Sequence, residues 1–438
     1  MQDNSSRIWF WAIIVSLGGF LFGFDTAVIS GVEQTIQAQW GLSDGAVGQA
    51  VAVAIYGTII GALFGGIPAD RYGRKKTLYL VGLLYFISAL WSALSPNLTQ
   101  LVIARFIGGV GVGISSVVAP LYLTEIAPAK MRGQVVAAFQ FNLVLGIFVA
   151  YFSNYLIASD DPSIWRYMLG VEAVPALIYL LLLARVPRSP RWLTVKANES
   201  REALGVLLLI NPDTAEQQMA AIKTSESSQA KVAIGEFFTK KYSRPILLAF
   251  LFAAFNQLSG INAVIYYGPR IFESAGLEGE DALLSTVGIG LVNLVFTMLG
   301  MYLIDRFGRK RLMYLGSVGY ILSLAMMAAA FQYNWSGQVV AIATFAFIAS
   351  HAIGQGAVIW VFISEIFNNE VRSLGAALGS TTHWVFAALI TATFPSIRES
   401  LGPVLVFSVF AGFMVLQLLF VAYMMPETKG QQLEEMQL

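Results

Sequence analysis

Long apolar stretches alternate with short polar segments along almost the whole chain. A helix needs roughly 20 mostly apolar residues to cross the hydrocarbon core of a bilayer. The pattern therefore predicts an all-α integral membrane protein with twelve spanning helices. The predicted spans are residues 8–30, 46–68, 77–95, 99–122, 135–157, 167–186, 245–272, 282–304, 312–331, 338–364, 373–396 and 402–425.

The segments between these spans differ in charge. Most of the 27 Lys and Arg residues lie in the two tails and in the segments after spans two, four, six, eight and ten. Arg166 and Arg398 are the clear exceptions. Because cytoplasmic loops carry an excess of Lys and Arg, we expect both termini to be cytoplasmic.

The composition of the chain argues against several classes of function. Hydrophobic residues make up 57% of the chain and charged residues only 12%, with a net charge of +1. This small net charge makes nucleic acid an improbable partner. The chain has no cysteine and two histidines, so we expect no thiol chemistry and no metal site. The first apolar run exceeds the length of a signal peptide, so we interpret it as a retained span.

Three charged motifs occur twice, at offsets of 235 to 240 residues, and each copy follows the matching span of its half. The pairs are residues 70–75 and 305–310, residues 124–132 and 364–372, and residues 187–189 and 426–428. Parallel repeats of this kind are found in secondary transporters. We therefore predict two pseudo-symmetric six-helix bundles, at 1–186 and 245–438. A polar linker with short helices, 187–244, joins them and acts either as a passive connection or in gating.

Charged side chains are predicted at membrane depth in the first half: Asp25, Arg105 and Glu172. Insertion of such a residue costs roughly 2.5–3.5 kcal/mol, so these side chains usually face a cavity or a partner. One interpretation is a static ion pair between Arg105 and either acid. The other is proton coupling, in which Asp25 exchanges its contact with Arg105 for a proton.

The seventh span contains an unusual polar run. Asn256, Gln257 and Asn262 lie around Gly260, and the pair Gly268-Pro269 follows. Gly260 and this pair are predicted weak points of the helix, and broken helices are expected near the substrate of a transporter. Gln257 and Asn262 are about 140° apart on an ideal helix, so they share a site only if the helix loosens near Gly260. Other spans add the polar side chains Gln140, Asn293, Gln355 and His383 and the nearby Trp360 and Trp384.

These side chains have a common chemical character. Amides both donate and accept hydrogen bonds, and tryptophan adds a flat apolar face. The combination suits a neutral polyhydroxylated ring. Each amide considered alone could instead bridge two helices, as Asn and Gln often do in membranes.

Five further segments, together with the duplicated Asp-Arg-x-Gly-Arg-Lys motif, resemble the sugar porter family of the major facilitator superfamily, and most of all its bacterial D-xylose/proton symporters. The segments are residues 23–31, 105–109, 187–193, 257–262 and 426–430. The resemblance covers essentially the whole chain. It implies import of a pentose or hexose with a proton, by alternating access, through a multi-pass protein of the plasma (inner) membrane.

The resemblance also implies roles for individual residues. Asp25 would be the proton site and Arg105 its partner, with Glu172 nearby. The sugar contacts would be Gln140, Asn256, Gln257, Asn262, Asn293, Gln355 and His383, flanked by Trp360 and Trp384. Tyr266 and Tyr267 would form part of the outer gate. A cytoplasmic salt-bridge network would contain Asp70, Arg74, Glu125, Arg132, Asp305, Arg309, Glu365 and Arg372.

Three residues depart from the family pattern. Asn256 stands where the family usually has glutamine, and His383 where many members have an amide. Arg188 replaces the usual glutamate after Pro187, so we expect the salt bridges at that corner to be rewired.

The alternatives are an uncoupled sugar facilitator, a non-transporting sugar sensor and a carrier of another solute class. Facilitators typically have asparagine at the position of Asp25, and sensors tend to have long cytoplasmic tails. No set of catalytic side chains points to an enzyme. We expect no cofactor besides the coupling proton, and a functional monomer in the lipid bilayer.

Overall fold

A computed structural model describes residues 5–128, 130–227, 234–368 and 370–430, and every regular element in these ranges is a helix. The first half contains α1 (Ser5–Val28), η1 (Ile29–Gly31), α2 (Glu33–Trp40), α3 (Asp44–Phe64), α4 (Gly66–Tyr72), α5 (Arg74–Leu94), α6 (Leu98–Ile126), α7 (Arg132–Ile157), α8 (Trp165–Gly170), α9 (Ala173–Leu182) and η2 (Leu183–Arg185).

The middle of the chain contains α10 (Pro190–Val195), α11 (Ser200–Ile210), η3 (Pro212–Thr214), α12 (Ala215–Ser227), α13 (Ile234–Phe237) and η4 (Lys240–Tyr242). The last part contains α14 (Ser243–Leu258), α15 (Ile261–Ser274), α16 (Glu280–Phe307), α17 (Arg309–Gln332), α18 (Gly337–His351), η5 (Ala352–Gly356), α19 (Ala357–Glu365) and α20 (Arg372–Tyr423).

The long apolar helices confirm the prediction of an all-α membrane protein. Within the described ranges, eleven helical stretches are long and apolar enough to cross a membrane. The last of them, α20, has 52 residues and includes Gly402, whose φ of 77° and ψ of 156° are not helical. Pro403 follows directly. This kink divides α20 between the predicted spans 373–396 and 402–425.

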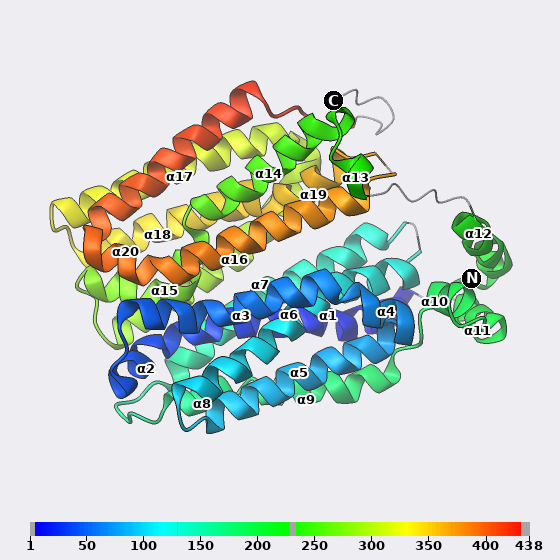
Figure 1. The fold of residues 1–438 in the computed structure, drawn as a ribbon, viewed down its shortest axis with the longest axis horizontal. Coiled ribbons are helices and arrows are strands. Elements are labelled where there is room, and N and C mark those ends of the chain that lie inside the picture. The colour runs from blue at the N-terminus through cyan, green and yellow to red at the C-terminus, as the bar shows by residue number, and fades with distance from the viewer. Residues whose placement is uncertain (1–4, 129, 228–233, 369, 431–438) are drawn as a thin grey trace. The chain divides into compact units, whose positions relative to one another are not determined.

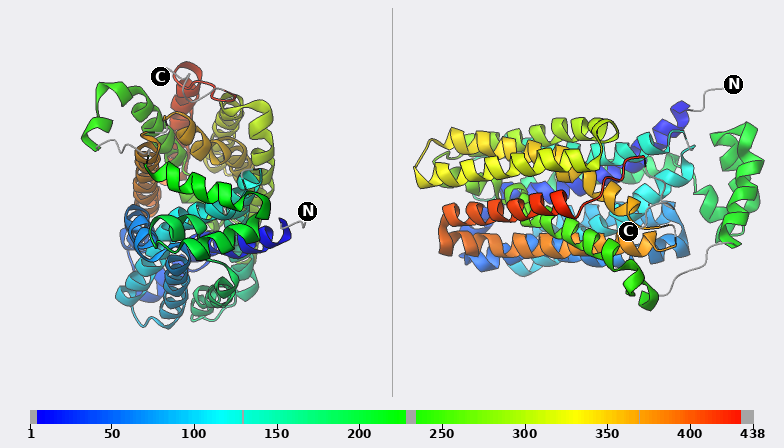
Figure 2. Two further views of the ribbon diagram at one scale, coloured as in Figure 1. Left: turned by 90° about the vertical axis from the view of Figure 1, so that its right-hand side faces the viewer. Right: turned by 90° about the horizontal axis from the view of Figure 1, so that it is seen from above.

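The chain forms two compact units (Figures 1 and 2). The first unit contains residues 1–28, 53–150 and 163–230, and the second contains residues 29–52, 151–162 and 231–438. From the first sequence half, η1, α2, the start of α3 and the end of α7 thus belong to the second unit. The predicted division at 187–244 concerns the sequence repeat and remains a prediction.

Close backbone contacts hold the first unit together. Helices α5 and α6 pack along each other, and α6 also packs on α1. Gly109 on α6 lies against the backbone carbonyl of Ala54, where a Cβ would clash. Small residues at such crossings allow membrane helices to approach closely. The short helices α10, α11 and α12 form a group at the end of this unit near α4 (Figure 1).

Aromatic packing holds the second unit together. Phe252 on α14 stacks on Phe362 of α19 with ring centroids 5.1 Å apart, and it meets Phe420 of α20 edge-on at 6.2 Å. These rings lie in a larger buried cluster of apolar residues from α14, α16, α17, α19 and α20. The second unit thus has its own core.

The seventh span is broken where the sequence predicted. Helix α14 ends at Leu258 and α15 begins at Ile261, with Gly260 between them at φ 85° and ψ 14°. This left-handed conformation favours glycine, which has no Cβ. Tyr267, just before the Gly268-Pro269 pair, is also non-helical, with φ −125° and ψ 24°.

Candidate functional site

The charged residues predicted at membrane depth in the first unit lie together. The Arg105 guanidinium donates from Nη1 to Asp25 Oδ1 at 2.6 Å and from Nη2 to the Asp25 carbonyl oxygen at 2.7 Å. The Glu172 carboxyl interacts with both residues. Gly108 leaves room for the group, because a Cβ there would stand 3.2 Å from Asp25 Oδ1.

The group is almost completely buried and holds more acid than base. Asp25, Arg105 and Glu172 are each exposed by no more than 2%. One guanidinium can balance only one carboxylate, and an unpaired buried charge is costly. Several buried polar atoms around the group have no hydrogen-bond partner among the described residues: Glu172 Oε1, Arg105 Nε, Tyr85 Oη, Ser88 Oγ and Tyr179 Oη. The geometry is that of a site able to hold one proton.

In the second unit, the break in the seventh span brings the predicted amides together. Asn262 Nδ2 donates to Gln257 Oε1 at 2.9 Å. Gln257 Nε2 donates to Asn256 Oδ1 at 2.8 Å, and Asn256 Nδ2 donates to Gln355 Oε1 at 3.0 Å. Gln257 and Asn262 are therefore in direct contact, as expected if the helix loosens near Gly260.

The amides continue into two helices that the sequence analysis did not connect to them. Gln355 Nε2 donates to Gln417 Oε1 at 2.5 Å, and Gln417 Nε2 donates to Ser317 Oγ at 2.8 Å. Ser317 Oγ donates in turn to the Met313 carbonyl oxygen at 2.7 Å. Gln417 and Ser317 are fully buried. We call the six side chains Asn262, Gln257, Asn256, Gln355, Gln417 and Ser317 the amide chain.

His383 joins the amide chain to the tryptophans. Gln257 Nε2 lies 3.3 Å from both ring nitrogens of His383. The His383 ring centroid is 5.1 Å from that of Trp360 and 5.0 Å from that of Trp384. Trp360 is 42% exposed, although its neighbours are mostly buried. The two tryptophan rings thus lie next to His383, which in turn contacts the amide chain.

The other residues predicted to line the sugar path are described by their own contacts and burial. Asn293 on α16 is buried and accepts from Thr297 Oγ1 at 3.3 Å. Tyr266 and Tyr267 are buried in α15, and Tyr267 Oη donates to the Thr391 carbonyl oxygen at 2.8 Å. Gln140 is half-buried on α7 in the first unit.

One of the duplicated charged motifs builds an ion-pair network in the first unit. Arg74 lies 2.9 Å from a Glu125 oxygen and 3.1 Å from an Asp70 oxygen. Ser189 Oγ donates to the same Glu125 carboxylate at 2.5 Å. Trp192 Nε1 donates to the Asp70 carbonyl oxygen at 2.8 Å and ties α10 to this network.

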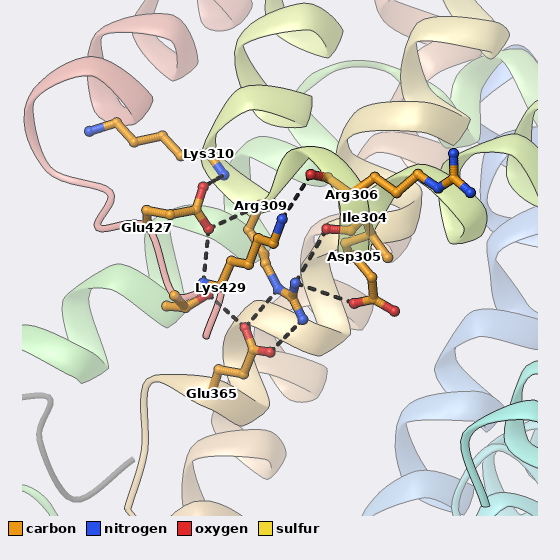
Figure 3. A network of polar contacts seen from close by, with 9 residues as sticks. Ile304, Asp305, Arg306, Arg309, Lys310, Glu365, Glu427 and Lys429 are labelled. Atoms are coloured by element: carbon orange, nitrogen blue, oxygen red, sulfur yellow. Dashed lines mark hydrogen bonds and ion pairs between the residues drawn. The ribbon is translucent and has the colours of Figure 1, made fainter. Parts of the chain in front are cut away.

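The second unit repeats this network with the equivalent residues (Figure 3). Arg309 lies 2.7 Å from a Glu365 oxygen and 3.4 Å from an Asp305 oxygen. Thr428 Oγ1 donates to the Glu365 carboxylate at 2.6 Å, as Ser189 does to Glu125. The contacts therefore follow the sequence repeat.

The second network has an additional helix cap. The Glu427 carboxylate accepts from the backbone nitrogens of Arg309 at 3.0 Å, Lys310 at 3.1 Å and Lys429 at 3.0 Å. Burial opposes ionisation of Glu427, but these N–H groups outweigh it and hold its pKa below the ordinary value. Gly308 has φ 86°, and a Cβ there would stand 2.6 Å from the carboxylate.

Arg188 occupies the equivalent place in the first unit and makes different contacts. Its guanidinium lies 2.7 Å from Glu199 and 2.8 Å from Glu202, at the start of the α11 region. Arg188 thus binds acids, whereas its counterpart Glu427 caps a helix. That the corner is rewired relative to the family stays a prediction. The sequence did not indicate which acids would receive Arg188.

Arg132 and Arg372 stand outside both networks in this structure. Arg132 is exposed at the first residue of α7. Arg372 Nε and Nη2 have no hydrogen-bond partner among the described residues. Their place in a salt-bridge network remains a prediction.

A second buried ion-pair cluster was missed in the sequence. Arg270 Nε donates to Glu33 Oε1 at 2.9 Å, and Arg270 Nη1 lies 3.3 Å from Asp44 Oδ1. Gln37 accepts from Arg270 and donates to Asp44. Burial raises the pKa of Glu33, although Arg270 opposes this. Arg270 lies near the end of the predicted seventh span. A charged residue within a span usually has a partner, so the sequence could have indicated a buried ion pair here.

Comparisons with known proteins show which proteins this chain is similar to. The model of the family described as "Sugar (and other) transporter" matches residues 11–438. The arabinose-proton symporter of Bacillus subtilis is 35% identical over 429 residues, 96% of this chain and 92% of that protein. The D-xylose-proton symporter of Escherichia coli K12 is 36% identical over 475 residues, 100% of this chain and 96% of that protein. A partially occluded, inward-open structure of the Escherichia coli xylose transporter XylE superposes with a TM-score of 0.86 at 33% identity, covering 98% of this chain and 100% of that one.

Proposed function

This chain belongs to the family of sugar (and other) transporters, with the membrane-spanning major facilitator fold, and we propose that it imports a monosaccharide together with a proton. It is a multi-pass membrane transporter rather than an enzyme. The proposed substrate is a neutral pentose or hexose such as D-xylose or D-glucose. The symporters for arabinose and D-xylose among its relatives support this substrate class.

The buried group of Asp25, Arg105 and Glu172 carries the proposal of proton coupling. The ion pair of Arg105 with Asp25 leaves the second carboxyl without a balancing charge. A proton added to Asp25 removes the reason for Arg105 to stay beside it. Release of Arg105 then permits the loaded carrier to reorient, so that the proton gradient drives sugar inward.

The amides and tryptophans of the second unit form the proposed sugar site. Gln257 and Asn262 supply hydrogen bonds to sugar hydroxyls, and Trp360 and Trp384 flank the apolar faces of the ring. Asn256, Asn293, Gln355 and His383 complete this side of the site, and Gln140 contributes from the first unit. Their mutual hydrogen bonds and the exposed face of Trp360 support the assignment.

Alternating access completes the proposed mechanism. The networks around Arg74 and Arg309 stabilise the cytoplasmic ends of the helices, and Arg132 and Arg372 join them when the site opens outward. Tyr266 and Tyr267 close the outer side of the substrate path.

We further propose that both termini are cytoplasmic, that the protein lies in the plasma (inner) membrane and that it works as a monomer. The chain ends, residues 1–4 and 431–438, lie outside the described residues.

The decisive experiment uses purified protein in sealed liposomes that contain a pH-sensitive dye. D-xylose, L-arabinose and D-glucose are added outside in turn, and empty liposomes serve as the control. Sugar entry that acidifies the lumen supports symport and identifies the sugar. Radiolabelled sugar that equilibrates without a pH change indicates a facilitator, and no entry of any monosaccharide contradicts the proposed function.

A further inference from the structure

The hydrogen bonds of the amide chain all run in one direction. Each side chain donates to the next, from Asn262 towards Ser317, and Ser317 donates to the Met313 carbonyl oxygen. A backbone carbonyl can only accept. The last bond therefore fixes the Ser317 hydroxyl so that its lone pairs face Gln417.

This fixed end orients the amides before it. Gln417 must donate to Ser317, so its oxygen faces Gln355. Gln355 must then donate to Gln417, so its oxygen faces Asn256. Rotating either glutamine amide by half a turn would place two donors or two acceptors face to face. Buried polar atoms left in that state are strongly unfavourable.

The orientation determines what the far end of the chain can bind. Asn256 donates to Gln355, so its oxygen receives one N–H of Gln257. The other N–H of Gln257 points to His383. Both N–H groups of Gln257 are thus engaged inside the protein. What Gln257 can still offer to a ligand is the remaining lone pair of Oε1, because Asn262 uses only one of the two.

We propose that Gln417 and Ser317 are positioning residues for the sugar site. Acting through Gln355 and Asn256, they hold the Gln257 amide as a pure acceptor, so that it selects a sugar hydroxyl that donates. This inference rests on the proposed function. It goes beyond that function because Gln417 and Ser317 lie on α20 and α17, outside the set of residues assigned to sugar.

The test compares Gln417→Met and Ser317→Ala with the wild-type protein in liposomes and in detergent. Methionine matches glutamine in length but cannot hold the amide chain in one direction. The control is Thr344→Val, because the Thr344 hydroxyl is also fully buried but donates within its own helix to the Val340 carbonyl oxygen. Uptake kinetics give KM and the maximal rate, and calorimetry gives the Kd for the transported sugar.

We expect Gln417→Met to raise both KM and Kd by about 5- to 10-fold while the maximal rate stays within about two-fold, since a lost ground-state contact acts in this way. We expect Ser317→Ala to raise KM and Kd in the same way but by less. If Gln417→Met does not fold, Ser317→Ala serves as the test variant. The control keeps the wild-type KM and Kd. A lower melting temperature with unchanged KM and Kd overturns the inference, because it makes Gln417 a simple bridge between helices.

Deoxyfluoro sugars provide a second readout, because a C–F group never donates a hydrogen bond. The informative position is the sugar hydroxyl that donates to Gln257. We expect replacement of this hydroxyl by fluorine to weaken binding to the wild-type protein as much as its replacement by hydrogen does. In Gln417→Met the amide is free to turn, so the penalty for fluorine shrinks. An equal penalty in both proteins contradicts the inference. A wild-type protein that binds no monosaccharide refutes the proposed function itself, whereas normal wild-type binding with unaffected variants refutes this inference alone.

Discussion

At the scale of single residues, Asp25 illustrates how burial and charge create a switch. The Asp25 carboxylate lies 2.6 Å from the Arg105 guanidinium. Both side chains are almost completely buried, so neither can interact with bulk water instead. Such a pair is strongly coupled, because removing one partner leaves the other as an isolated buried charge. Glu172 adds a second acid to the same space. Any proton that enters therefore changes which groups Arg105 can contact.

The first prediction concerns Asp25→Asn. The amide cannot take up or release a proton, so we expect sugar counterflow to continue and accumulation driven by a pH gradient to stop. Both are measured in liposomes with radiolabelled sugar. Asp281→Asn, an exposed position in the first turn of α16, is the control and should keep both activities. Accumulation that survives in Asp25→Asn would remove this residue from the coupling mechanism.

Single residues also show where sequence reasoning ends. The charges at Asp25 and Arg105 could be identified because charge is rare at membrane depth. Gln417 lies in an equally apolar span, but its importance depends on Gln355 and Ser317, which come from other helices. The direction of these hydrogen bonds depends on side chains from several helices, so it cannot be predicted from the sequence of one helix alone.

At the scale of elements, the broken seventh span depends on one backbone conformation. Gly260 has a positive φ, and its position against the Phe410 ring leaves no space for a Cβ, which would lie 2.5 Å from the ring. The break turns Asn262 back towards Gln257. The sequence predicted the location of this break from glycine, whereas the resulting contact required the structure.

We therefore predict that Gly260→Ala destabilises the protein. The left-handed conformation alone costs about 1–3 kcal/mol for a residue with a side chain, and the contact with Phe410 adds to it. The melting temperature in detergent should fall by several degrees, and sugar binding should weaken because Asn262 moves. Gly412→Ala, at a helical glycine with open space around it, should leave both unchanged. A fully stable Gly260→Ala would show that the break does not need glycine.

The start of α17 is stabilised by Glu427, whose carboxylate accepts from the first two backbone N–H groups of that helix, Arg309 and Lys310, and also from the N–H of Lys429. We predict that Glu427→Gln costs about 1 kcal/mol at neutral pH, a typical value for a cap. Because the pKa of Glu427 is lowered in the folded protein, its contribution is present above the ordinary glutamate pKa and is lost as the pH falls through the lowered value.

Thermal unfolding across a pH series tests this cap. The difference between wild type and Glu427→Gln should stay constant near neutrality and close only below about pH 4. Glu278→Gln, at an exposed position, should show no such difference. A difference that closes near pH 6 would contradict the lowered pKa.

At the scale of the whole molecule, residues from both sequence halves meet in the second unit. Arg270 of α15 binds Glu33, which follows the first span, and Asp44, which begins the second. This cluster explains in part why residues 29–52 belong to the second unit. The sequence repeat predicted two equal halves, but such a contact between them cannot be seen in a pattern of apolar and polar positions.

We predict that Arg270→Gln lowers stability by about 3 kcal/mol, because it leaves Glu33 buried without its cation. The pKa of Glu33, already raised by burial, then rises further. A raised carboxyl pKa costs stability as the pH rises through it. The deficit in melting temperature should thus be small in acid and largest near neutral pH.

The double variant Glu33→Gln/Arg270→Gln provides the internal control. Without either charge the penalty should largely disappear, and its pH dependence with it. A double variant as unstable as Arg270→Gln would mean that the arginine acts through Asp44 and Gln37 instead.

The two ion-pair networks carry a consequence for the history of the chain. A hydroxyl, a carboxylate and a guanidinium meet in the same way at Ser189, Glu125 and Arg74 as at Thr428, Glu365 and Arg309. An ancestor of half the present length, assembled with a second copy of itself, would already have carried this arrangement in each copy. Fusion of two such genes would free each copy to diverge. Arg188 and Glu427 differ in the way that such freedom allows, because one of the two equivalent positions binds acids and the other caps a helix.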